Sequence, residues 1–214
     1  YSNGLLAIGW AMLYFTTFAT YYIEASQIIF NANLCLLLLF VVSGAMAIFS
    51  CFYESEEFSI MAVFLGALSA IISNVPFVSL SAIIILIAYS VIVAIYKNWA
   101  TLAFFSIIAS YLTYRIALAR QEIFTQELFQ IGSLFLIIYF ILFVIASFFV
   151  NSGKYERGKY VTSLIAVNTF SFFVLFINQL YLFYPDTDGY FAGLLGIILL
   201  YLAGFSYSLI REKK

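Results

Sequence analysis

Long apolar runs separated by short polar breaks make up nearly the whole chain. A helix that crosses ~30 Å of hydrocarbon needs roughly 20 mostly apolar residues, at ~1.5 Å of rise per residue. About eight such runs occur, divided by charges, prolines or clusters of Asn, Ser and Gly. The pattern predicts an all-α fold, a polytopic transmembrane helical bundle in one domain. The expected spans are residues 4–23, 28–53, 58–73, 77–97, 99–118, 128–150, 160–184 and 191–210.

Two parts of this pattern allow alternatives. The run at 58–73 is short for a crossing, so it either crosses with little tilt or re-enters on the same side. A full crossing is favoured, because a re-entrant segment would reduce the charge asymmetry of the later loops. Residues 115–130 place apolar and polar positions at helical spacing. They form either a helix lying in the membrane interface or extensions of the two flanking spans.

Composition places the chain in a bilayer. Of its 214 residues, 65% are hydrophobic and 9% charged, with a mean hydropathy of +1.10. Soluble domains carry about 25% charged residues, so a soluble fold of this composition would expose aggregating apolar patches. The absence of histidine excludes His-dependent catalysis and most zinc or haem sites. A net charge of −1 argues against a nucleic-acid partner.

Basic residues predict the orientation. Seven of the nine Lys and Arg fall on the side that both termini share, and Arg115 and Arg120 fall on the other. Since cytoplasmic loops carry the excess of Lys and Arg, we expect a multi-pass protein of the cell membrane with both ends of this segment cytoplasmic. Its expected partners are membrane lipids, together with other membrane subunits or further helices of the same chain.

Five polar side chains within the apolar runs are the candidate functional residues: Arg115, Asn168, Ser171, Asn178 and Gln179. An amide in hydrocarbon needs a hydrogen-bond partner, so it should face other helices. Asn168 and Gln179 lie eleven residues apart, close to three helical turns, and share a face. That face either joins helices by hydrogen bonds or lines a path for water or substrate. Arg115 either snorkels to the interface or belongs to such a path.

Other polar groups lie at the ends of the runs. Glu54, Glu56 and Glu57 form an acidic cluster, which is either a solvated loop or a cation site. Cys35 and Cys51 lie in apolar runs without metal or redox spacing and are interpreted as small hydrophobes. The sequence contains no phosphate-binding glycine loop and no hydrolase or protease motif. We therefore predict no catalytic residue, no cofactor and no metal site.

Tyrosines and tryptophans gather near the ends of the expected spans, which is typical of the aromatic belt at the membrane interface. Tyr96 with Trp99 and Tyr111 with Tyr114 are interpreted in this way. The segments 77–118 and 128–184 each read as a two-helix hairpin with a basic turn, so a recurring hairpin is expected.

The first hundred residues resemble a bacterial family of very large multi-spanning membrane proteins, domain of unknown function 2339. The stretch Gly4-Leu-Leu-Ala-Ile-Gly-Trp to the tyrosine pair at Tyr22 carries the resemblance. A Gly-containing helix at 59–73 and the sequence Tyr96-Lys-Asn-Trp-Ala-Thr-Leu follow in the family's order. This chain departs from the family in having Ala67 in place of a second Gly.

The resemblance implies further helices on either side, so we expect this segment to be part of a longer protein. It implies no activity. The near absence of deep charge favours a non-enzymatic envelope scaffold or partner-binding module. The alternatives are a transporter or flippase for a small amphipathic or lipid-like solute, using the polar face of the seventh span, and a membrane enzyme acting on lipid-linked substrates.

Overall fold

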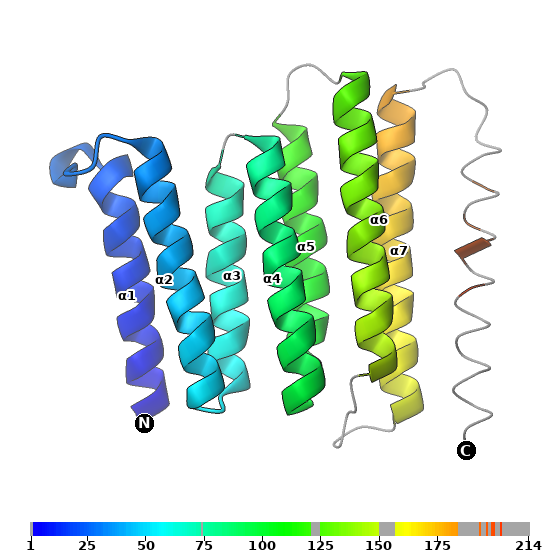
Figure 1. Ribbon diagram of the computed structural model, residues 1–214, viewed down its shortest axis with the longest axis horizontal. Helices are drawn as coiled ribbons and strands as arrows, with labels where there is room; N and C mark the ends of the chain where they lie inside the picture. The colour runs from blue at the N-terminus through cyan, green and yellow to red at the C-terminus, as the bar shows by residue number, and fades with distance from the viewer. Residues whose placement is uncertain are drawn as a thin grey trace.

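The computed structural model describes residues 2–73, 75–120, 125–149 and 157–183, with positions 193, 196, 198, 199 and 202. Over these residues the fold is all-α, as expected, with seven α-helices and one 3-10 helix. They are α1 (Ser2–Tyr22), η1 (Glu24–Ser26), α2 (Ala32–Phe52), α3 (Glu56–Ile72), α4 (Pro76–Lys97), α5 (Ala100–Ala119), α6 (Gln126–Phe149) and α7 (Arg157–Phe183). Consecutive α-helices run antiparallel (Figure 1).

Five of these helices are long and apolar enough to cross a membrane: α2, α4, α5, α6 and the Val161–Phe183 part of α7. This composition is that of a multi-pass membrane protein. The expected span at 191–210 lies outside the described residues except for five single positions, so the total of about eight spans stays a prediction.

The two ambiguous segments have clear structures. The short run at 58–73 is one continuous 17-residue helix, α3, which runs alongside α2 and α4 and does not turn back (Figure 1). In the stretch 115–130, α5 continues to Ala119 and α6 begins at Gln126. The flanking helices therefore occupy both ends of that stretch, and residues 121–124 lie outside the described part.

Local sequence explains where the helices begin and end. Asn31 caps α2 by accepting a hydrogen bond from the Asn33 N–H at 3.0 Å, and Ser55 caps α3 at the Phe58 N–H. A cap of this kind satisfies one of the N–H groups that a helix start leaves unpaired. Pro76 is the first residue of α4, where its missing N–H costs nothing. Asn98 ends the same helix in the left-handed conformation, at φ 57°.

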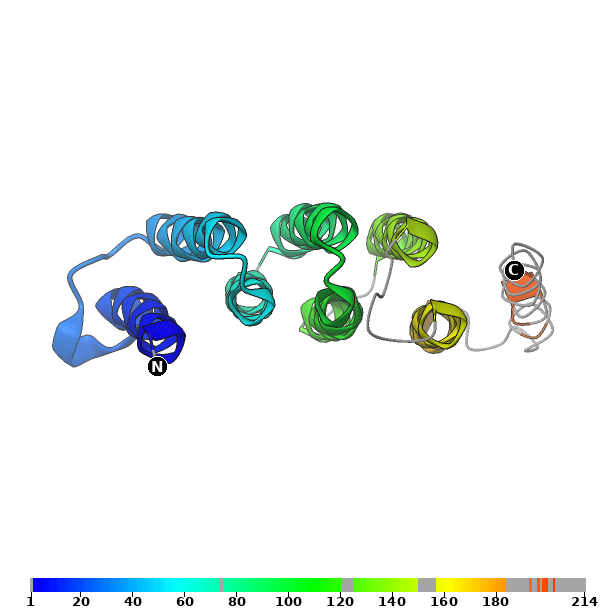
Figure 2. The same cartoon turned by 90° about the horizontal axis from the view of Figure 1, so that it is seen from below.

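The helices form an elongated array of two rows (Figure 2). One row holds α2, α4 and α6, and the other holds α1, α3, α5 and α7. Among the described residues, all the extensive helix contacts join helices that are one or two steps apart in chain order. The hairpin predicted at α4–α5 and α6–α7 recurs in α2–α3 as well, so the array is built from repeated antiparallel pairs.

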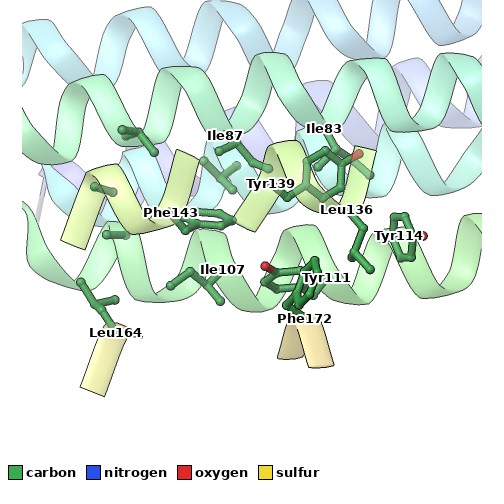
Figure 3. Packing of buried hydrophobic residues seen from close by; sticks show 14 of the residues in the cluster. Ile83, Ile87, Ile107, Tyr111, Tyr114, Leu136, Tyr139, Phe143, Leu164 and Phe172 are labelled. Carbon is green, nitrogen blue, oxygen red and sulfur yellow. The ribbon is translucent and has the colours of Figure 1, made fainter. Parts of the chain in front are cut away.

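The apolar core follows the seam between the rows in two clusters. The smaller joins α1, α2 and α3 around Tyr14, Leu39 and Met46. The larger joins α3 to α7, and Figure 3 shows its centre, where Ile83 and Ile87 lie near Tyr139. Large apolar side chains also cover the outside of the helices, which is the surface that lipid would contact.

Candidate functional site

The polar face of α7 turns inward toward α5 and α6. Asn168 is 0% exposed and Gln179 is 4% exposed, so the two amides predicted to share a face are both buried. Ser171 is half-buried and Asn178 is exposed. The stripe is thus divided, with two amides in the protein interior and a third at the surface.

Asn168 forms the first of two similar contacts. The hydroxyl of Tyr111, on α5, donates to Asn168 Oδ1 at 2.6 Å. Asn168 Nδ2 in turn donates to the backbone carbonyl of Phe140, on α6, at 3.1 Å. One amide therefore joins three helices, and both ends of its side chain have partners.

Gln179 repeats this arrangement nearer the end of α7. Tyr114, one turn from Tyr111 on α5, donates to Gln179 Oε1 at 2.8 Å. Gln179 Nε2 donates to the carbonyl of Phe129, on α6, at 3.1 Å. The two tyrosines are three residues apart while the two amides are eleven apart, so the hydroxyls must reach in opposite directions along α5, as Figure 3 shows. We call these two contacts the tyrosine–amide clasps.

Tyrosine hydroxyls join other helices of the array too. Tyr14 on α1 bonds Ser69 on α3 at 2.9 Å, and Tyr139 on α6 donates to the Leu80 carbonyl on α4 at 2.8 Å. Tyr89 on α4 lies within hydrogen-bond distance of Ser50 and Ser59, at 2.8 and 2.7 Å. Buried phenols act along the whole array as links between helices.

The interpretation of Tyr111 and Tyr114 as interfacial aromatics is wrong. Both side chains are buried and hydrogen-bonded, whereas Tyr96, at 81% exposed, does have the exposure of a belt residue. Sequence reasoning also assigned no role to Tyr89 and Tyr139. Their positions near the middle of apolar runs were the available signal, because a phenol in hydrocarbon needs a partner.

The acidic cluster contacts the start of α5. Glu56 Oε1 accepts from the Leu102 N–H at 2.9 Å, which is one of the N–H groups that α5 leaves unpaired. Glu54 forms a salt bridge of 2.7 Å with Lys97, and this hydrogen bond holds the pKa of the Glu54 carboxyl below its usual value. The solvated-loop interpretation is therefore wrong for Glu56, which is half-buried and ties α3 to α5.

Glu56→Ala is expected to lower the free energy of unfolding by about 1 kcal/mol, the usual cost of losing a helix cap. The measurement is SDS titration of the purified chain in detergent, followed by circular dichroism. Glu54→Ala is the matched control: its ion pair is solvent-exposed, so its effect should be smaller. Equal losses of unfolding free energy in the two variants would contradict the capping role of Glu56.

Basic side chains at the opposite end have different environments. Arg120 donates to the Ile71 carbonyl at the end of α3. A cation is stabilised there by the negative end of the helix dipole. Arg115 forms no salt bridge with any residue that the structure describes. It lines a shallow notch between α5 and α7, together with Asn178, Gln179 and leucines of both helices.

The described residues contain no cluster of three or more acidic or cysteine side chains that could hold a metal ion. Cys35 and Cys51 are free thiols, with Cys35 buried and Cys51 half-buried. The small-residue pairs Ser43/Ala47 and Gly66/Ala70 lie in the buried faces of α2 and α3, where they allow close helix contact.

Comparisons with protein-family models, curated proteins and solved structures find no match to this chain. The family resemblance of the first hundred residues therefore stays a prediction.

Proposed function

We propose that this chain is a non-enzymatic membrane scaffold, a helical section that holds neighbouring membrane segments or subunits in place. The observation that carries the proposal is the use of its deepest amides. Asn168 and Gln179 have partners on two other helices at both ends of each side chain. Groups that could line a solute path instead fix helices to one another.

The two-row architecture supports the same function. Helices arranged in rows present two long faces, with α2, α4 and α6 along one side (Figure 2). Such an arrangement offers contact area to lateral neighbours, with α1 and α7 at opposite ends of the described array. Further helices, as the family resemblance implies, would extend the rows.

Transport by the face of α7 has less support. That alternative needs a large cavity beside Asn168 and Gln179. Both amides are buried and hydrogen-bonded to Tyr111 and Tyr114, and the notch that Gln179 lines has space for about one water molecule. The lipid-linked enzyme alternative needs free interfacial carboxylates, yet Glu56 is engaged with the backbone of α5.

For orientation, we propose that the end of the array carrying Lys97 and the start of α7 faces the cytoplasm. Arg115 and Arg120 then lie at the outer end. The antiparallel order of the helices supports this grouping (Figure 1), and the excess of Lys and Arg in the sequence gives the direction.

Cysteine labelling distinguishes a scaffold from a transporter. In a chain with Cys35→Ala and Cys51→Ala, single Ser110→Cys and Ser171→Cys substitutions leave both amides intact. Ser110 directly precedes Tyr111, and Ser171 lies about one turn after Asn168 on α7. A membrane-impermeant maleimide should react with them on the order of tenfold more slowly than with Asn178→Cys, because only a hydrated thiolate reacts. Equal rates would reveal a water path and favour transport.

The same cysteine-free chain tests for lateral partners. A photo-crosslinker attached through Leu37→Cys or Ile85→Cys, both exposed in the row of α2, α4 and α6, is expected to give discrete protein adducts in native membranes. A crosslinker attached at buried Ser110→Cys is the control and should give none. Lipid adducts alone at positions 37 and 85 would oppose the scaffold proposal.

A further inference from the structure

The notch between α5 and α7 contains two polar side chains that take no part in the tyrosine–amide clasps. Its polar rim is formed by Arg115 and Asn178, and its walls include Leu118, Leu175 and Leu182. It has space for about one water molecule and is partly open. Arg115 lies one turn before the end of α5, near the end of the apolar span.

Arg115 brings a guanidinium group to this notch. It is half-buried and pairs with no carboxylate among the described residues. The other arginine at this end, Arg120, is bound to the Ile71 carbonyl on another helix. The exposed amide of Asn178 adds a neutral donor on the facing helix.

These features fit the phosphate of a lipid headgroup. A guanidinium offers parallel N–H donors that match two phosphate oxygens, and the leucines of the lining offer apolar contacts to the start of an acyl chain. A zwitterionic headgroup would place its own cationic group near the Arg115 guanidinium, and the described residues of the notch supply no anion to pair with it. An anionic headgroup therefore fits better.

We propose that the Arg115–Asn178 notch binds one anionic phospholipid through its phosphate, at the surface formed by α5 and α7. This site goes beyond the scaffold function, since it would exist whether or not the array binds a protein partner. The alternative is that Arg115 simply snorkels to the headgroup layer. In that case no lipid would bind in a fixed ratio, and Asn178 would have no role.

Native mass spectrometry of the purified full chain in detergent tests the proposal, with phosphatidylglycerol and phosphatidylcholine as probes. One phosphatidylglycerol should bind, in preference to phosphatidylcholine. Arg115→Gln should weaken it about tenfold, the loss expected for a hydrogen-bonded charge pair. Asn178→Leu should weaken it less, and Arg120→Gln, the control at the same end, should leave it unchanged.

Three results would overturn the site: equal binding of the two lipids, equal binding by the wild type and Arg115→Gln, or an equal loss in Arg120→Gln. Displacement by millimolar inorganic phosphate would also overturn it, by assigning the notch to free phosphate. If Arg115→Gln does not fold, Arg115→Lys replaces it. Lysine keeps the charge and loses the paired donors, so a severalfold weakening is still expected.

Discussion

Replacing Asn168 with leucine is expected to lower the free energy of unfolding by about 1–2 kcal/mol. The substitution leaves the Tyr111 hydroxyl without its acceptor in a buried position, and an unsatisfied buried group costs about 1–3 kcal/mol. The lower half of that range applies in a membrane, where the unfolded helices also find polar partners. SDS titration in detergent measures the loss.

A double-mutant cycle isolates the clasp itself. Tyr111→Phe and Asn168→Leu together should cost less than the sum of the single changes, with a coupling of about 0.6–1.7 kcal/mol. Asn178→Leu is the matched control on the same helix, since its side chain is exposed, and its effect should stay within about 0.5 kcal/mol. Additive losses would mean that the Tyr111–Asn168 bond stabilises nothing.

Gly132→Ala is expected to destabilise the chain by about 1–3 kcal/mol, the usual cost of overpacking. A Cβ at this position of α6 would lie 2.6 Å from Gln179 Nε2 and 3.1 Å from the Tyr114 hydroxyl. Gln179 cannot move aside freely, because its two ends are bonded to Tyr114 and to the Phe129 carbonyl. One methyl group should therefore break the second clasp.

Gly66→Ala provides the comparison, because its Cβ would lie equally close, at 2.6 Å, to the end of the Leu86 side chain. The Leu86 side chain is half-buried and forms no hydrogen bond, so it can rotate away. We therefore expect a smaller loss of unfolding free energy. Gly44→Ala, which meets nothing within 4 Å, should be neutral or slightly stabilising. If Gly132→Ala and Gly66→Ala lower the free energy of unfolding equally, the hydrogen bonds of Gln179 add no rigidity.

Helix positions follow from local signals and were therefore predictable. The expected span 77–97 differs from α4 by one residue, because a proline fixes its start and Lys97-Asn98 marks its end. The common face of Asn168 and Gln179 also follows from local spacing, since helical period alone aligns residues eleven apart.

The partners of these residues did not follow from local signals. Tyr111 and Asn168 are separated by 57 positions, and Tyr114 and Gln179 by 65. Periodicity identifies the face of a helix and leaves open which helix lies against it. Because Tyr111 and Tyr114 lie toward the end of an apolar span, the belt interpretation competed with a buried one until the packing of α5 against α7 was known.

Glu56 shows the same limit at a helix end. Its sequence context, among other acids after an apolar run, is that of a solvated loop. Its role depends on α5 beginning beside α3, a contact between helices two steps apart. Capping across two helices leaves no pattern within either one.

The restriction of helix contacts to near neighbours in the chain has a consequence for biogenesis. When α3 enters the membrane, α1 and α2 are already available, and the three can bury the cluster around Tyr14, Leu39 and Met46. Later helices likewise meet partners synthesised shortly before them. Since few contacts require distant segments to meet, the chain can fold in the order in which the ribosome delivers it.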